Sequence, residues 1–552
     1  MNISKGIPEN NAIYLNYIEG LETQEYKVDI SESQVCLQAS TDCGMLYAIQ
    51  TLRQIIRQEG LVIPCLEITD YPQIKNRGLY YDVTRCRIPT LDYMKKLVDT
   101  LSFYKINQLH LYIEHTYMFK RLSEVWRDDT PLTSNEILEL DAYCQERNVE
   151  LVPSIAAFGH LYKVLRTKTY RSLSEREELC DDSFSFVDRM EHHTLDVSNE
   201  ESFQFVTSLI EEYMPLFKSD KFNICGDETF DLGKGKSEKL ADTIGEQEMY
   251  VQYIKRLCEY LVERGKTPMF WGDIICESPD AIKKLPEKTI CLNWGYSANV
   301  DEVNTEKLAK AGARLYNCPG VSGWNQFVNQ VEVSYENIRR MCAYGIKYGV
   351  EGILNTDWGD YGHVNHPDMA MTGIIYGAAF SWNKDIPEFD DINQQISVVQ
   401  YGDRKEAFVK IVSNISTLWK YKWEDLVWFK EKEKNEWDES SILELKQALS
   451  DLKSKKKELQ EYVAKMNGHK KEIIRPYLIA VDGMILLQRI GIALSGHKQD
   501  ASLAESIEKW FYYYKTEWRK VSREAELFHI QEVICWIADY LRSIENKKES
   551  DF

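Results

Sequence analysis

The sequence predicts an α/β protein with a central (β/α)8 TIM barrel, a small N-terminal α+β domain and a helical C-terminal domain. Strand-like and helix-like segments alternate eight times between about residues 77 and 382, as expected for eight parallel strands that close into a barrel. No Gly-x-Gly-x-x-Gly motif follows the first strand, which disfavours a doubly wound dinucleotide-binding sheet. Strand signals disappear after about residue 387. We therefore predict three domains: residues 1–72, 73–385 and 386–552.

The predicted small domain combines short strand-like runs with one helix. That helix is expected over residues 45–57, where Leu46, Ile49 and Leu52 repeat at the spacing of one helical face. We expect a module of this size to support the barrel, because it is too small to contain much chemistry by itself.

The barrel domain is predicted from eight strand-then-helix units over about 310 residues. An open doubly wound sheet would usually have fewer strands. The predicted strands are residues 78–83, 108–113, 149–153, 221–225, 267–271, 289–293, 313–317 and 352–355.

The C-terminal region is predicted to be helical throughout. Ile442, Leu445, Leu449 and Leu452 keep helical spacing, and the basic run 453–457 is interpreted as a solvated helix face. We expect this domain to pack on the barrel or on a second subunit, which leaves a homodimer open.

Composition excludes several classes of protein. The chain of 552 residues is 44% hydrophobic, which excludes a disordered or fibrous protein. Its 67 basic and 87 acidic residues give a net charge of −20, so a nucleic-acid partner is not expected. No apolar stretch approaches the ~20 residues that cross a bilayer, so no membrane partner is expected either.

The cysteine pattern and the N-terminus bear on location. Thirteen cysteines are scattered singly, without a Cys-x-x-Cys pair, which favours free thiols in a reducing compartment over disulfides. The first residues lack the apolar core of a signal peptide. The expected location is the cytoplasm.

Polar and aromatic residues close the predicted strands, and in such a barrel the active site lies at the carboxyl ends of the strands. These candidates are Asp82, Arg85, Glu114-His115, Gly159-His160, Gly226-Asp227-Glu228, Trp271-Gly272-Asp273, Asn293-Trp294, Tyr316-Asn317 and Trp358-Gly359-Asp360. Several tryptophans together with carboxylates predict a sugar site, because indole faces stack on the apolar face of a pyranose while carboxylates bind its hydroxyls. Arg85 could equally form a salt bridge inside the barrel.

The pair Asp227-Glu228 is the most specific indication of catalysis in this pattern. Adjacent carboxylates repel each other, which tends to separate their pKa values. Neighbours on one strand project in different directions, so they do not flank a glycosidic bond as a facing pair does. This geometry favours one protein acid/base and a nucleophile supplied by the substrate.

Five segments, in order and at barrel spacing, resemble glycoside hydrolase family 20, the β-N-acetylhexosaminidases. The segments are GMLYAIQTLRQ at 44–54, RGLYYDVTR at 77–85, KINQLHL at 105–111, Gly159-His160 and Gly226-Asp227-Glu228. The resemblance spans the small domain and the barrel, about two thirds of the chain. It implies a retaining exo-β-N-acetylhexosaminidase that releases terminal GlcNAc or GalNAc from oligosaccharides.

The resemblance also implies catalytic roles. Glu228 would be the general acid/base, which protonates the leaving oxygen and later activates water. Asp227 would orient the 2-acetamido group of the substrate, whose carbonyl oxygen attacks the anomeric carbon. His160 would lie behind the acid and support its hydrogen bonding. No metal or cofactor is implied, and the partner would be a small N-acetylhexosaminide.

Further residues are implied to bind the sugar. Trp271, Trp294 and Trp358 would form the walls of the acetamido site, and Tyr316 would donate a hydrogen bond to the acetamido carbonyl. Arg77 and Asp360 would hold sugar hydroxyls.

Three positions depart from the family pattern. Glu114-His115 stands where the family commonly has an acidic pair, and Glu114 is our candidate for that role. Strand eight ends in Trp-Gly-Asp where Trp-x-Glu is usual, and Cys318 stands where Asp is frequent. Preference between gluco and galacto sugars therefore stays open.

Two other functions stay open at this stage. A conventional two-carboxylate glycosidase would need a second carboxylate ~5 Å from Glu228, for which Asp360 and Glu114 are candidates. A sugar-binding barrel without catalysis is the other alternative, although it would have no need of the adjacent Asp-Glu pair.

Overall fold

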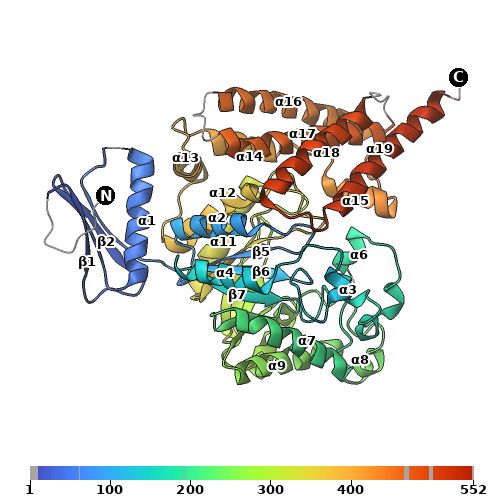
Figure 1. Cartoon of the computed structure of the whole chain (residues 1–552), viewed down its shortest axis with the longest axis horizontal. Helices are drawn as coiled ribbons and strands as arrows, with labels where there is room; N and C mark the ends of the chain where they lie inside the picture. Colours follow the sequence, from blue (N-terminus) through green and yellow to red (C-terminus); the bar gives the residue numbers. More distant parts are fainter. Residues whose placement is uncertain (1–9, 61, 192, 465–470, 497–501, 550–552) are drawn as a thin grey trace.

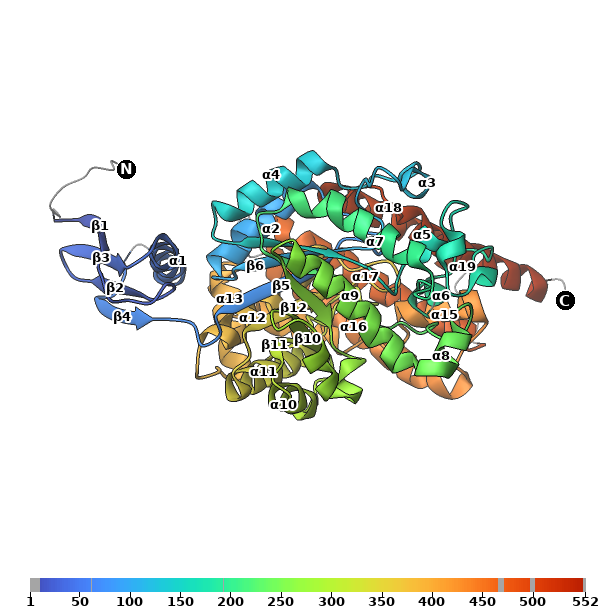
Figure 2. The same ribbon diagram turned by 90° about the horizontal axis from the view of Figure 1, so that it is seen from below.

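A computed structural model of the chain describes residues 10–60, 62–191, 193–464, 471–496 and 502–549. Figures 1 and 2 show three parts: a small domain at one end, a barrel in the middle and a helical region along one side of the barrel.

The small domain is a four-stranded sheet covered by one helix. Its elements are β1 (Ala12–Tyr17), β2 (Tyr26–Ile30), β3 (Gln34–Ala39), α1 (Asp42–Glu59) and β4 (Leu66–Asp70). The strand order is β1-β3-β2-β4, with β1 parallel to β3 and the other pairs antiparallel. The Thr41 side chain caps α1 by accepting a hydrogen bond from the Gly44 amide, which satisfies one of the free amides at the start of the helix. Val28 and Leu37 of the sheet belong to the same buried core as Met45 of the helix.

The central domain is a closed barrel of eight parallel strands, which confirms the predicted fold. The strands are β5 (Asn76–Asp82), β6 (Gln108–Ile113), β7 (Glu150–Ile155), β8 (Lys221–Asn223), β9 (Thr267–Trp271), β10 (Ile290–Trp294), β11 (Arg314–Cys318) and β12 (Gly352–Asp357). Strand β12 pairs with β5 and so closes the sheet.

Helices connect most of the strands along the outside of the barrel. They are α2 (Leu91–Phe103), α4 (Ser134–Gln145), α7 (Glu200–Tyr213), α9 (Glu246–Glu263), α10 (Val303–Lys310), α11 (Val331–Tyr348) and α12 (Met371–Trp382). After β9 the connection consists of 3₁₀ turns, Ile275–Glu277 and Pro279–Lys284.

The small domain packs against the amino ends of the barrel strands. Arg77, at the start of β5, donates a hydrogen bond to the Tyr47 hydroxyl of α1, and Lys105, just before β6, donates one to the Tyr26 hydroxyl of β2. The carboxyl ends of the strands therefore lie on the opposite side of the barrel from the small domain.

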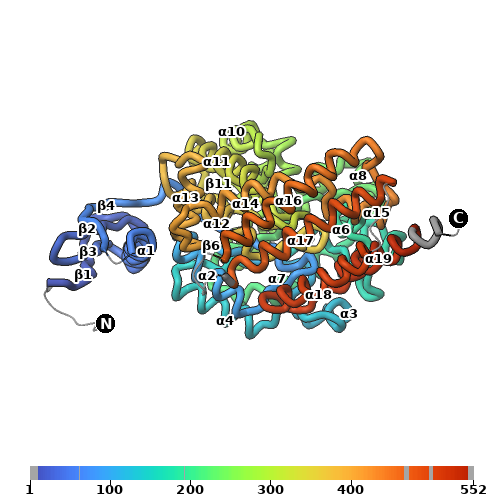
Figure 3. The backbone as a smooth tube through the Cα atoms, turned by 90° about the horizontal axis from the view of Figure 1, so that it is seen from above, coloured from blue at the N-terminus to red at the C-terminus, as the bar shows by residue number. Residues whose placement is uncertain are grey.

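The C-terminal region is helical and packs on the barrel in one continuous hydrophobic core. Its helices are α13 (Phe389–Val399), α14 (Phe408–Ser416), α15 (Trp423–Lys432), α16 (Ile442–Ala464), α17 (Lys471–Leu494), α18 (Leu503–Val521) and α19 (Leu527–Glu549). Figure 3 shows α14, α16 and α17 crossing over the barrel, with α18 and α19 beside them.

One C-terminal helix departs from the sequence-based expectation about apolar stretches. The segment Glu472–Leu494 is long and apolar enough to cross a membrane, and 67% of its most apolar window is buried inside the fold. In the structure it contacts α16 and α18. Its apolar surface thus forms part of the core of the helical domain.

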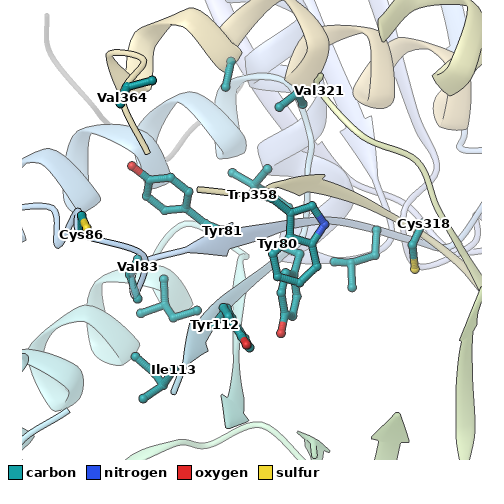
Figure 4. Packing of buried hydrophobic residues seen from close by; sticks show 14 of the residues in the cluster. Tyr80, Tyr81, Val83, Cys86, Tyr112, Ile113, Cys318, Val321, Trp358 and Val364 are labelled. Atoms are coloured by element: carbon teal, nitrogen blue, oxygen red, sulfur yellow. The ribbon is translucent and has the colours of Figure 1, made fainter. Parts of the chain in front are cut away.

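Aromatic rings fill the barrel interior near the carboxyl ends of the strands. The Tyr80 ring centroid lies 4.9 Å from that of Trp271 and 5.1 Å from that of Trp358, and Tyr112 lies 5.2 Å from Trp358. Figure 4 shows Tyr80, Tyr112 and Trp358 converging from β5, β6 and the end of β12. Two of these three pairs are edge to face and the third is tilted. Because closely packed rings stabilise one another and resist displacement, they form a rigid floor for residues at the strand ends.

Candidate active site

The Asp227-Glu228 pair lies where the chain leaves β8. The strand ends at Asn223, two residues before the predicted end, because the Asn223 side chain accepts a hydrogen bond from the Cys225 amide and turns the chain. Cys225, Gly226 and Glu228 then have positive φ angles of 56°, 89° and 48°. This irregular backbone leaves the Glu228 side chain 32% exposed and the Asp227 side chain only 11% exposed.

His160 lies against both carboxylates. Its Nε2 atom is 3.6 Å from Asp227 Oδ2 and 3.3 Å from Glu228 Oε2. Burial by itself lowers the pKa of His160, but the two carboxylates outweigh it and raise that pKa to about 10. His160 is therefore a cation at neutral pH, held between the two acids.

Two glycines permit this close approach. At Gly159 an added Cβ would lie 2.8 Å from the Asp227 carbonyl oxygen, so any side chain there would push the His160 segment away from the acidic pair. At Gly226 the backbone is left-handed, and an added Cβ would lie 2.7 Å from the Ile254 side chain. Both motifs that flank the acids thus require glycine for steric reasons.

Asp273 supports the pair from the end of β9. Its Oδ2 atom accepts a 3.1 Å hydrogen bond from the Glu228 amide. Burial, and next the charge of Asp227, raise the pKa of Asp273 to about 7. This carboxylate fixes the backbone that carries Glu228.

Three of the predicted aromatic residues lie in this region. Trp271 and Trp358 pack together with a centroid distance of 5.8 Å, and both contact Tyr80 of the aromatic floor. Trp294, at the end of β10, is half-buried and stacks on Tyr296 at 5.1 Å. The Trp358 indole donates a 2.8 Å hydrogen bond to the Tyr296 hydroxyl, so Trp294 and Trp358 are joined through one tyrosine.

A buried ion cluster around Arg85 borders the aromatic floor. The Arg85 guanidinium lies 3.4 Å from Asp82, 3.5 Å from Glu114 and 3.2 Å from Asp360. It also lies over the Tyr112 and Trp358 rings, at 5.3 and 5.1 Å. Burial raises the pKa of Asp360 to about 6, although Arg85 lowers it in part. Glu114 and Asp360, both predicted, are thus brought together by an arginine.

The prediction for Arg77 was wrong. Arg77 precedes β5 and therefore lies at the amino end of the barrel, where its guanidinium is buried and donates to the Lys105, Ile74 and Lys75 carbonyls. It also lies 4.8 Å from the Trp382 ring. Arg77 joins the small domain to the barrel, and Arg85 is the arginine at the strand ends.

The prediction for Tyr316 was also wrong. Its ring packs over Gly352, where an added Cβ would lie 2.5 Å from the tyrosine ring. Gly352 is the first residue of β12, so the Tyr316 side chain lies in the half of the barrel near the amino ends of the strands. Tyr296 takes its place among the residues at the strand ends, beside Trp294 and Trp358.

Sequence reasoning missed several residues of this region, and the signals differed. Arg85 was named as a strand-end candidate, but the sugar-binding role was given to Arg77; the signal for Arg85 was that it follows strand one whereas Arg77 precedes it. Tyr296 had another, because it lies two residues beyond Trp294. Arg189, which contacts both Glu114 and Glu526, and Glu526 itself had none: Arg189 lies in the short helix Phe186–Glu191, and Glu526 lies between two C-terminal helices.

Two groups of acidic and histidine side chains are close enough to hold a metal ion among the described residues. One is His160, Asp227 and Glu228, whose ligand atoms lie within 4.8 Å of one another. There the protonated His160 already supplies a positive charge. The other is His115, Asp129 and Glu526; within it, Lys163 places an ammonium 3.1 Å from Asp129 and 3.3 Å from Glu526.

Comparison with known families decides the affiliation of this chain. The model of the glycosyl hydrolase family 20 catalytic domain matches residues 75–322, and the model of domain 2 of the same family matches residues 3–71. The chain belongs to glycosyl hydrolase family 20. The matched parts of this family 20 chain include Asp227 and Glu228 and end before β12 and the helical C-terminal domain.

Several curated relatives are named β-hexosaminidases. The protein of Akkermansia muciniphila is 29% identical over 46% of this chain and 56% of its own length. The protein of Porphyromonas gingivalis is 25% identical over 49% of this chain and 38% of its own length. The family 20 chain described here thus spans about half the length of the curated relatives that it matches.

Solved structures share the fold. A Flavobacterium johnsoniae chitobiase has a TM-score of 0.60 at 18% identity and covers 90% of this chain and 85% of its own. A β-N-acetylhexosaminidase from Bacteroides fragilis has a TM-score of 0.56 at 18% identity, over 71% of this chain and 84% of its own.

Proposed function

We propose that this family 20 chain is a retaining exo-β-N-acetylhexosaminidase, in which the 2-acetamido group of the substrate acts as the nucleophile. Family membership supports a glycoside hydrolase, and the curated names of the relatives support the class of sugar. The observation that carries the proposal is at Asp227, whose Oδ1 atom is buried and accepts no hydrogen bond from the described residues. A buried carboxylate oxygen without a donor is costly, and the N–H of an acetamido group would satisfy it.

The mechanism follows from the positions of the two acids. Asp227 accepts a hydrogen bond from the acetamido N–H, so that the carbonyl oxygen attacks the anomeric carbon and a cyclic oxazolinium ion forms. Glu228, the more exposed acid, gives its proton to the departing glycosidic oxygen. Water then attacks the anomeric carbon, Glu228 takes its proton, and the ring opens with the original anomeric configuration.

The alternative with two protein carboxylates is less well supported. Glu114 lies between Arg85 and Arg189 and also accepts a hydrogen bond from Tyr112, and Asp360 is paired with Arg85. A carboxylate held by a guanidinium is a weak nucleophile, because the pairing stabilises its charge. The acetamido group is therefore the better candidate for the nucleophile.

The decisive experiment compares aryl glycosides that differ in one group. We expect hydrolysis of p-nitrophenyl N-acetyl-β-glucosaminide or the galactosaminide, and ~10³-fold slower hydrolysis of p-nitrophenyl β-glucoside, since the latter has no nucleophile to place on the anomeric carbon. A thiazoline analogue of the cyclic ion should inhibit tightly. Equal rates with and without the acetamido group would instead favour the two-carboxylate mechanism. Binding of N-acetylglucosamine without any turnover would favour a sugar-binding barrel.

We also propose that the protein resides in the cytoplasm. All thirteen cysteines are free, eight of them buried, which suits a reducing compartment. Titration of the native and unfolded protein with a thiol reagent tests this proposal: thirteen thiols should react after unfolding, and a lower number would indicate disulfides.

A further inference from the structure

The helical C-terminal domain reaches the candidate site through one buried acid, Glu526. This residue lies between α18 and α19 and is 2% exposed. Its carboxylate is 2.8 Å from Arg189 Nη1, 3.2 Å from His115 Nε2 and 3.3 Å from Lys163 Nζ. All three partners belong to the barrel domain: His115 follows β6, Lys163 lies in α5 (Tyr162–Leu165) and Arg189 lies in α6 (Phe186–Glu191). Figures 1 and 2 both show α6 beside α15 and α19.

Arg189 connects this acid to the ion cluster around Arg85. Its Nη1 atom faces Glu526, and its Nη2 atom lies 3.1 Å from Oε2 of Glu114. The other Glu114 oxygen is 3.5 Å from Arg85 Nε, and Arg85 in turn contacts Asp360. Glu526, Arg189, Glu114 and Arg85 are each at most 4% exposed. They form an alternating row of charges, which we call the ion relay.

The ion relay needs both of its acids, Glu526 and Glu114, to pair its two arginines. Buried guanidinium groups are costly unless every one is paired, and an arginine can bind two carboxylates through separate edges. Without the charge of Glu526, Glu114 would be the only carboxylate partner of Arg189 among the described residues, and Arg189 would compete for it with Arg85. The position of Arg85 relative to Asp360 therefore depends on an acid that is 337 residues away from Arg189 in the chain.

The same domain holds the two loops that carry Arg85 and Asp360. Beyond β5, Arg87 donates a 2.9 Å hydrogen bond to the Ser522 hydroxyl, and Pro89 forms a β-bridge with Ser522. Beyond β12, the Trp423 indole donates a 2.7 Å hydrogen bond to the Tyr361 carbonyl. Both loops are thus fixed from outside the barrel.

We infer that Glu526 is a positioning residue of the active site: through the ion relay it fixes Arg85 against Asp360, so that the C-terminal domain is needed for sugar binding. This inference rests on the proposed function. Glu526 lies outside the residues matched by the family models.

The test uses two variants on the ion relay and two controls in the full-length protein. Glu526→Gln removes the charge and keeps the shape, and Arg189→Lys removes the fork that reaches both acids. Lys163→Gln removes a partner of Glu526 that does not lead to Arg85. Glu517→Gln removes a buried acid of the same domain that is paired with Arg475 and Lys520.

The expected result is a rise in KM with little change in kcat. Displacement of a group that positions the substrate costs ~10- to 100-fold, so KM for the aryl N-acetylglucosaminide should rise at least ~10-fold in both relay variants. The controls should stay within ~3-fold of the parent. In an Arg85→Met background, Glu526→Gln should add almost nothing, because the interaction it supports is already lost.

Other outcomes separate the two proposals. If the parent protein hydrolyses the substrate and KM is unchanged in both relay variants, the positioning role is wrong while the proposed function stands. If the parent protein is inactive, the proposed function fails. A crystal structure of Glu526→Gln still tests positioning in that case: Arg85 should move away from Asp360, and an unmoved Arg85 overturns the inference. If Glu526→Gln does not fold, Arg189→Lys provides the same measurement.

Discussion

The Nε2 atom of His160 lies 3.3 Å from Oε2 of Glu228. The His160 imidazole therefore lies against the Glu228 side chain and helps to hold it at the end of β8. Burial lowers the pKa of His160, but Asp227 first and Glu228 second outweigh it and raise that pKa to about 10.

Stability should fall as the pH rises above 6.5. The folded pKa of His160 is raised above the ordinary value of 6.5, so the stabilisation is fully present below pH 6.5 and is lost as the pH rises towards 10. Thermal unfolding of the parent protein and of His160→Gln between pH 6 and 10 measures this effect. The difference in Tm between them should shrink as the pH rises, and a constant difference would falsify the charged state of His160.

Replacement of Glu228 by Gln should lower kcat by ~10²- to 10⁴-fold, because the amide cannot donate a proton to the leaving oxygen. Substrates whose leaving group needs no protonation should be affected less. The measurement compares an aryl glycoside that has an acidic phenol with a natural disaccharide. An equal loss on both would show that Glu228 acts in some other way than as the general acid.

Replacement of Asp227 by Asn should lower kcat by ~10²- to 10³-fold, the scale of removing one preorganised electrostatic group. The neutral amide no longer stabilises the positive charge that develops on the acetamido nitrogen. The matched control is Asp231→Asn, a buried acid beyond the pair whose Oδ2 atom accepts a hydrogen bond from the His193 amide. Comparable losses of kcat in both variants would contradict a specific role for Asp227.

Replacement of Arg77 should affect stability, whereas replacement of Arg85 should affect substrate binding. Arg77→Met leaves the buried carbonyls of Ile74 and Lys105 without their side-chain donor, at a cost of about 3 kcal/mol. We expect a lower Tm in calorimetry and an unchanged KM. Arg85→Met should raise KM instead, and a raised KM in Arg77→Met would restore the original prediction for that residue.

Sugar binding should weaken in acid through Asp360. Its pKa is about 6, so the carboxylate loses its charge as the pH falls through 6 and accepts sugar hydroxyls less well. KM, measured between pH 4.5 and 7.5, should rise at the acid end in the parent protein. Asp360→Asn should raise KM at pH 7.5 and remove this dependence; a dependence that persists would assign it to another group.

The alternation of apolar runs and helical segments was sufficient to predict the barrel, because eight buried parallel strands followed by helices have few ways to pack. The strand-end rule then identified Asp227, Glu228, His160, Trp358 and Asp360, whose positions depend only on where a strand ends. The same rule would have excluded Arg77, since a residue before a parallel strand lies at the opposite end of the barrel.

What the sequence by itself determined is the order of the strands and the residues at their ends, because both follow from local patterns in the chain. Only the tertiary structure decided which side chains meet there. Tyr316 points toward the amino ends of the strands, because the direction of its side chain is set by its position within β11. A resemblance to a family motif does not fix that direction. Glu526 reaches the site because the C-terminal helices fold back on the barrel, and no local pattern encodes a contact across 337 residues.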